Sequence, residues 1–147
     1  MRLFSGQPAK AFSKQMIKEA LTAHGINFLV DDDGELVTTV QGSPAFFFRV
    51  GQLGEMLQLR VMVMPPFDVD DVPMLYRFCN GWNHDNLWPK AYVHVSDNGL
   101  VNVVGDYVVD WEKGVTAEQL EHALMCGLVG GGQLVDSVAE LRDAPKG

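Results

Sequence analysis

The sequence predicts an α+β domain in which helices flank a mainly antiparallel β-sheet. The predicted elements follow the order helix, four strands, helix, two strands, helix, and they lack the strand–helix alternation that requires a parallel sheet. The chain has 147 residues, 47% of them hydrophobic, which is enough for one domain with its own core. We expect a flexible leader at 1–12, a single domain at 13–141 and a frayed tail at 142–147.

The chain first predicts a helix and then a β-hairpin. Ser13 is a suitable N-cap for a helix with apolar residues at helical spacing. Gly25 follows this helix, as expected for a residue that ends a helix in the left-handed conformation. Ile26–Val30 and Leu36–Val40 are the predicted strands, joined by a turn at Asp31–Gly34.

Two further strands are expected at Ala45–Val50 and Glu55–Met64, after a break at Gly42–Pro44. The second of them has the clearest alternation of side chains, which places one face in the core and the other face outside it. The core face comprises Leu57, Leu59, Val61 and Val63, and the other face comprises Met56, Gln58, Arg60, Met62 and Met64.

The second half predicts a helix and another hairpin. Asp70 or Asp71 can cap a helix that carries Pro73 in its first turn. Apolar residues of this helix form one stripe, made of Val72, Leu75, Tyr76, Cys79 and Trp82. Strands are expected at Lys90–Val95 and Leu100–Val109, around a turn at Asn98-Gly99.

A last helix begins at Thr116, because Thr116 and Gln119 have the spacing of a capping box. Its apolar stripe is interrupted by Gly130–Gly132. Each glycine inside a helix costs about 1 kcal/mol relative to alanine. We therefore expect a kink, or a division into two helices, at the glycine run.

The chain is acidic: eleven Lys and Arg against nineteen Asp and Glu give a net charge of −8. This charge repels phosphate backbones and anionic lipids, so nucleic acids and membranes are not expected partners. The N-terminus lacks the apolar segment of a signal peptide, and no apolar run reaches the roughly 18 residues of a membrane span. Cys79 and Cys126 fall on predicted apolar helix stripes, which favours free core thiols in a reducing cytoplasm.

The residue types that carry out catalysis do not form a familiar motif. The four histidines lack metal-ligand spacing, and Asp31–Gly34 lacks the alternating ligands of an EF-hand. No phosphate-binding glycine loop or nucleophile elbow is present. Asp106, Asp110 and Glu112 fit a solvated sheet face better than a catalytic carboxylate pair. We expect a protein without enzymatic activity, metal or cofactor.

Three methionines are the first candidates for partner binding. Met56, Met62 and Met64 lie on the outer face of the predicted strand at 55–64. Flexible thioethers suit adaptable contact surfaces, although a second core layer under a helix explains them equally well.

Two tryptophans around a polar link are the second candidate. Trp82, Asn83 and Trp88 lie where the second helix gives way to a strand. Tryptophan is prominent at interfaces. The alternative is structural: the tryptophans anchor this corner, and Asn83 bonds to the backbone of the turn.

The segment Trp82-Asn83, followed by Trp88-Pro89-Lys90-Ala91-Tyr92, resembles the YbjN family. Other motifs resemble the family in the same order along the chain, so that the resemblance covers about residues 13–141. They are Ala23-His24-Gly25-Ile26, Asp31-Asp32-Asp33-Gly34-Glu35-Leu36, Phe46-Phe47-Phe48 and Gly114-Val115-Thr116. Gly130–Gly132 departs from the unbroken last helix expected for the family.

The resemblance implies a bacterial protein, often dimeric, with a type III secretion chaperone-like fold of order α-β-β-β-α-β-β-α. Our prediction has one strand more in the first half. The family is labelled as sensory transduction regulators and has no established catalytic residues to carry over. A chaperone-like fold does not by itself imply chaperone activity.

Three functions remain open. The favoured one is a non-enzymatic regulatory or adaptor module that binds a protein partner, with basic partners favoured by the negative charge. The second is a small-molecule sensor or enzyme with a pocket between sheet and helices, using His84 or His94 as its polar group. The third is a structural homodimer with a large apolar self-interface.

Overall fold

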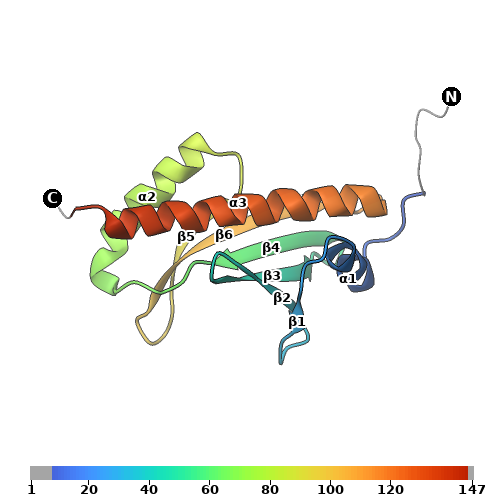
Figure 1. Cartoon of the computed structure of the whole chain (residues 1–147), viewed down its shortest axis with the longest axis horizontal. Coiled ribbons are helices and arrows are strands. Elements are labelled where there is room, and N and C mark those ends of the chain that lie inside the picture. Colours follow the sequence, from blue (N-terminus) through green and yellow to red (C-terminus); the bar gives the residue numbers. More distant parts are fainter. Residues whose placement is uncertain (1–7, 146–147) are drawn as a thin grey trace.

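Six strands form one antiparallel sheet in the computed structural model, which describes residues 8–145 (Figure 1). The strand order across the sheet is β1-β2-β3-β4-β6-β5. The elements along the chain are α1 (Lys14–Ala23), β1 (Leu29–Val30), β2 (Leu36–Val40), β3 (Ser43–Val50), β4 (Met56–Met62), a 3₁₀ turn (Val69–Asp71), α2 (Val72–Asp85), β5 (Lys90–Val95), β6 (Val101–Asp110) and α3 (Ala117–Asp143). The predicted α+β class and the extra strand in the first half are both confirmed.

The first half follows the prediction except at the boundaries of three strands, of which β4 spans Met56–Met62 instead of Glu55–Met64. The Ser13 hydroxyl accepts the Met16 N–H at 3.2 Å, as an N-cap does. β1 has only two residues, shorter than the predicted strand at 26–30. The predicted break at 42–44 is wrong, because Gln41 and Gly42 both adopt positive φ and form a two-residue hairpin turn. Ser43 therefore already belongs to β3.

The start of α2 and its apolar stripe need corrections. A 3₁₀ turn precedes α2, and no side chain caps the helix as predicted for Asp70 or Asp71. Instead, the Asp71 carboxylate accepts the backbone N–H of Asp68 at 3.4 Å. Leu75 is buried as expected, whereas Tyr76 is 60% exposed and lies outside the stripe.

The last helix is continuous, so the kink or division predicted at Gly130–Gly132 is wrong (Figure 1). The capping box at Thr116 is confirmed. The glycines are required by the packing of α3 on the sheet. A Cβ at Gly127 would lie 2.8 Å from Leu59, and a Cβ at Gly131 would lie 2.6 Å from Val61. The run thus allows a straight helix to approach the strands closely.

Both ends of the predicted domain extend further than expected. Phe12, assigned to the leader, is buried in the core, and Lys10 pairs with Val115 in an isolated bridge. Residues 1–7 of that leader and 146–147 of the tail lie outside the described residues. Arg142 and Asp143, assigned to the tail, belong to α3. No helix within 8–145 has both the length and the apolar character needed to cross a bilayer.

Candidate functional site

The two faces of the sheet have different surroundings. Leu57, Leu59 and Val61 of β4 are buried in the core, where α3 packs on the sheet. The residues between them point to the opposite side, which we call the uncovered face. Through the strand register, this face includes Val37, Phe46, Phe48, Met56, Gln58, Arg60, Met62, Val104, Asp106, Val108, Asp110, Lys90 and Tyr92.

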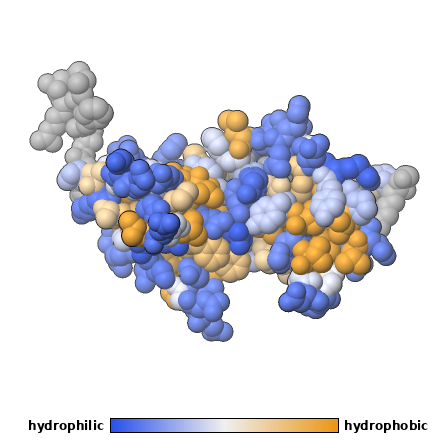
Figure 2. All heavy atoms as spheres, turned by 180° about the vertical axis from the view of Figure 1, so that it is seen from behind, coloured by the Kyte–Doolittle hydropathy of each residue, from blue (hydrophilic) through white to orange (hydrophobic). Residues whose placement is uncertain are grey.

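The apolar side chains of the uncovered face do not join the core between sheet and helices. Phe46 and Phe48 are half-buried and stack with their ring centroids 5.8 Å apart. Val104 is only 2% exposed, although it lies outside the core. Viewed from behind α3, apolar areas are separated by hydrophilic side chains (Figure 2).

A carboxylate lies at the centre of this face. Asp106 is 6% exposed, and it pairs directly across the strands with Arg60. Arg60 Nε and Nη2 donate to the two carboxylate oxygens at 2.9 and 3.1 Å. Gln58 Nε2 and the Tyr92 hydroxyl each donate to Asp106 Oδ2 at 3.1 Å. The buried charge is therefore compensated by a bidentate ion pair and two further donors.

The hydrogen bond to Asp106 raises the pKa of Arg60, and the nearby carboxylate charge contributes further. Burial, followed by the charge of Asp106, raises the pKa of Tyr92. Both donors consequently stay protonated at neutral pH. This arrangement fixes the side chains of Arg60, Gln58 and Tyr92 around Asp106.

Cations also lie against aromatic rings on this face. The Arg60 guanidinium is 5.8 Å from the centroid of Phe48, and Lys90 Nζ is 5.5 Å from the centroid of Tyr92. The apolar and polar parts of the face are thereby connected through cation–π contacts. The uncovered face is a preformed surface that combines aromatic, thioether and fixed polar groups.

The structure separates the predicted methionines from one of the tryptophans. Met56 and Met62 are half-buried on the uncovered face. Met64, just beyond β4, is 43% exposed, and its N–H donates to the Ser43 hydroxyl at 3.0 Å. Trp88 is 42% exposed and contacts Tyr107 on the helix side of the sheet, with the ring centroids 5.8 Å apart and the ring planes tilted by 54°. These residues do not form one continuous surface.

Trp82 and Asn83 make contacts within the chain. Trp82 is 8% exposed, and its Nε1 donates to the Pro89 carbonyl at 2.8 Å. The Asn83 carboxamide donates to the Ala91 carbonyl and accepts the Ala91 N–H, both at 2.9 Å. These contacts match the structural alternative, in which both residues anchor the corner between α2 and β5. A role for them in partner binding stays a prediction.

The sequence alone predicts no binding role for Phe46, Phe48, Arg60, Tyr92 or Asp106. One signal was available, because two phenylalanines alternate around Phe47 and a strand presents alternate residues to opposite faces. The pairing of Arg60 with Asp106 required the strand register, which the sequence alone does not give.

The two predicted histidines do not line the pocket that the structure shows between α2 and α3. His84 is exposed and lies 2.8 Å from the Asp85 carboxylate, and His94 is exposed on β5. A pocket does occur between the start of α2 and the end of α3, but its polar groups are arginines and an aspartate. Within residues 8–145, no three His, Cys, Asp or Glu side chains gather as metal ligands.

The YbjN family model, described as "Putative bacterial sensory transduction regulator", matches residues 13–140. The chain belongs to the YbjN family. Among solved structures, the crystal structure of YbjN from E. coli, titled "a putative transcription regulator", is similar with a TM-score of 0.77 and 16% identity. The match covers 91% of this chain and 96% of that one, and at this identity it shows a shared fold.

A second solved structure, the HopA1-SchA chaperone-effector complex, matches with a TM-score of 0.48 and 18% identity. The match covers 79% of this chain and 86% of that one. No curated protein matches the sequence.

Proposed function

We propose that this YbjN-family chain is a non-enzymatic regulatory adaptor of the bacterial cytoplasm that binds a segment of a partner protein on the uncovered face. One observation carries the proposal: aromatic and thioether side chains on this face lie outside the core and around a fixed polar centre. Aromatic residues, methionine and arginine are enriched in protein interfaces. The family description supports a regulatory role in general terms.

The surroundings of the face favour a partner segment with apolar and basic side chains. Asp110, at one end of the face, pairs across the sheet with Met56. The turn at Asp31–Asp33 adds three acidic residues beside β1, and the whole chain carries a charge of −8. Apolar side chains of the segment would contact Phe46 and Met62, and its basic side chains would meet the acidic border.

Affinity capture from cell extract with matched variants tests this proposal. Met62→Glu places a charge on the uncovered face, whereas Val129→Glu makes the same kind of change on α3, at a residue that is 60% exposed. We expect the wild type and Val129→Glu to retain a partner that Met62→Glu loses. Circular dichroism checks that each variant is folded. Retention of the same partner by Met62→Glu would contradict the proposal.

The homodimer implied by the family resemblance stays a prediction and concerns the same surface. A second copy on the uncovered face would also bury the apolar side chains, although two chains of charge −8 repel each other. Light scattering on the purified chain measures its mass. A dimer that Met62→Glu dissociates would assign the face to self-association instead of to another protein.

A further inference from the structure

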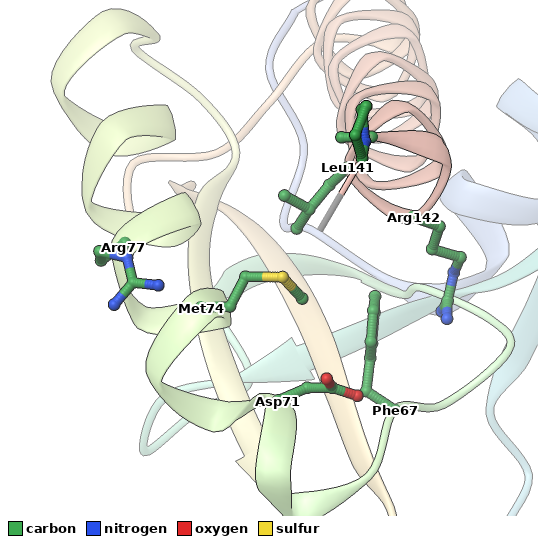
Figure 3. Close-up of a pocket in the computed structure, with 8 residues that line it drawn as sticks. Phe67, Asp71, Met74, Arg77, Leu141 and Arg142 are labelled. Carbon is green, nitrogen blue, oxygen red and sulfur yellow. The ribbon is translucent and has the colours of Figure 1, made fainter. Parts of the chain in front are cut away.

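A pocket of about 490 Å³ lies on the helix side of the sheet, between the start of α2 and the end of α3 (Figure 3). Its volume is within the range of small-molecule sites. The pocket is lined by Phe67, Met74 and Leu141, and its charged groups are Asp71, Arg77 and Arg142. The uncovered face contributes no residue to it, so this site is separate from the one proposed above.

The apolar lining comes from three different elements. Phe67 precedes the 3₁₀ turn, Met74 belongs to α2, and Leu141 belongs to α3. Phe67 is only 8% exposed, and Met74 and Leu141 pack against the core. These three side chains provide a firm apolar surface for a hydrocarbon group.

The guanidinium of Arg142 is held in place at the pocket. It stacks on Phe67, with Cζ 3.6 Å from the ring centroid, and it donates to the Pro65 carbonyl. A guanidinium has five N–H donors, and this carbonyl accepts only one of them. Burial lowers the pKa of Arg142, while the charge of Asp71 opposes that effect. A bound anion would compensate the charge further.

The balance of charge at this pocket differs from that of the whole chain. Two guanidinium groups and one carboxylate line the pocket, whereas the whole chain has a charge of −8. Within residues 8–145, neither Arg77 nor Arg142 is within 4.0 Å of a carboxylate oxygen. The presence of Asp71 disfavours a second negative charge on a ligand.

We propose that this pocket binds a small monocarboxylate with an apolar body. The carboxylate would accept hydrogen bonds from Arg142, and the hydrocarbon part would lie on Phe67, Met74 and Leu141. Arg77, on the opposite side of the pocket (Figure 3), would attract the ligand through its charge at longer range. This assignment does not depend on the protein partner proposed above. The monocarboxylate would then be a small-molecule signal that this chain detects.

Isothermal titration calorimetry with octanoate tests the site, and octanamide is the neutral ligand of nearly the same shape. We expect octanoate to bind at least about tenfold more tightly than octanamide, because charge-assisted hydrogen bonds to guanidinium are stronger than neutral ones. Octanedioate, with a second carboxylate, is expected to bind more weakly than octanoate.

Three variants locate the binding. Arg142→Gln should weaken octanoate binding by about tenfold, and Arg77→Gln, at an exposed residue, by about threefold. Arg49→Gln is the matched control, because Arg49 also lies near an aromatic ring, at 5.8 Å from Phe12, but away from the pocket. If Arg142→Gln fails to fold, Arg77→Gln and the octanamide comparison still decide. Absence of octanoate binding, equal affinity for octanamide, or unchanged binding by the folded arginine variants overturns the proposal.

Discussion

The two faces of the sheet are built on different principles. On the covered face, α3 approaches β4 so closely that a single added carbon at Gly131 would meet Val61 at 2.6 Å. On the uncovered face, neighbouring side chains bury one another, and a bidentate ion pair joins Arg60 to Asp106. Side chains on an uncovered face can therefore be ordered without belonging to the core. Such a face can be devoted to binding while the other maintains the fold.

The largest expected difference between the faces is in the cost of truncating a side chain. Leu59→Ala, on the covered face, should lower the free energy of unfolding by about 3 kcal/mol, because it leaves a cavity under α3. Met62→Ala, three residues along β4 on the uncovered face, should cost less than about 1 kcal/mol. Urea unfolding followed by tryptophan fluorescence measures both. Equal losses would show that the two faces contribute alike to the core.

The next effect tests whether the ion pair organises the uncovered face. Asp106→Asn should lower the free energy of unfolding by about 2 kcal/mol, since Arg60 loses its charged acceptor. The Arg60 side chain is 34% exposed, so solvent limits this loss. Asp136→Asn, at an exposed position on α3, is the control and should change stability by less than about 0.5 kcal/mol. A loss for Asp106→Asn no larger than that of the control would rule out an organising role.

A pair of glycine substitutions tests how closely α3 approaches the covered face, with Gly131 at the contact and Gly81 in α2 as the control. Gly131→Ala should destabilise the protein by about 1 kcal/mol, because the clash with the stiff Val61 side chain outweighs the higher helix propensity of alanine. Gly81→Ala, at an exposed position in α2 with no atom within 4 Å of the added carbon, should stabilise it by about 0.5–1 kcal/mol. Thermal unfolding measures whether each substitution raises or lowers the stability. Stabilisation by Gly131→Ala would contradict the close approach of α3.

The smallest expected effect is the titration of one buried thiol on the helix side, Cys79, which changes the free energy of unfolding only at alkaline pH. Burial raises the pKa of Cys79 to about 11, from 9.0. Because the pKa is raised in the folded state, this thiol contributes stability below about pH 9 and loses that contribution as the pH rises toward 11. At pH 8, iodoacetamide should modify the half-buried Cys126 and leave Cys79 unmodified, as mass spectrometry can show. Rapid modification of Cys79 in the folded protein would contradict its burial.

Local sequence signals predicted much of the fold. The cap at Ser13 and the capping box at Thr116 each depend on a few neighbouring residues, and each is present. A turn also forms at Asn98-Gly99, but only Gly99 adopts a positive φ, so the primed two-residue type that this pair predicts is wrong. The alternation along β4 correctly separated buried Leu57 from the half-buried Met56. The turn at Gln41 and Gly42 was missed, because a positive φ at glutamine is uncommon and the neighbouring proline indicated a break.

The errors arose where distant segments determine the outcome. Helix propensity predicted a break at the glycine run, but Gly127 and Gly131 are four residues apart and lie on the face that meets the sheet. That spacing indicates close packing of a helix only once its partner is known. Asp106 fitted a solvated surface, since its pairing with Arg60 depends on the register between β4 and β6. Of the residues on the uncovered face, the sequence therefore predicted only the methionines as binding residues.

Two side chains of α2 determine how the edge of the sheet meets other molecules. β5 is an outer strand, and outer strands are templates on which further chains can add and aggregate. The Trp82 indole N–H donates a hydrogen bond to the Pro89 carbonyl. The Asn83 carboxamide donates to the Ala91 carbonyl and accepts the Ala91 N–H, which are the bonds that an adjoining strand would make. An incoming strand must displace these bonds or pair only with the far end of β5. Asn83 thus fills, at Ala91, the backbone hydrogen-bonding groups that an incoming strand would need.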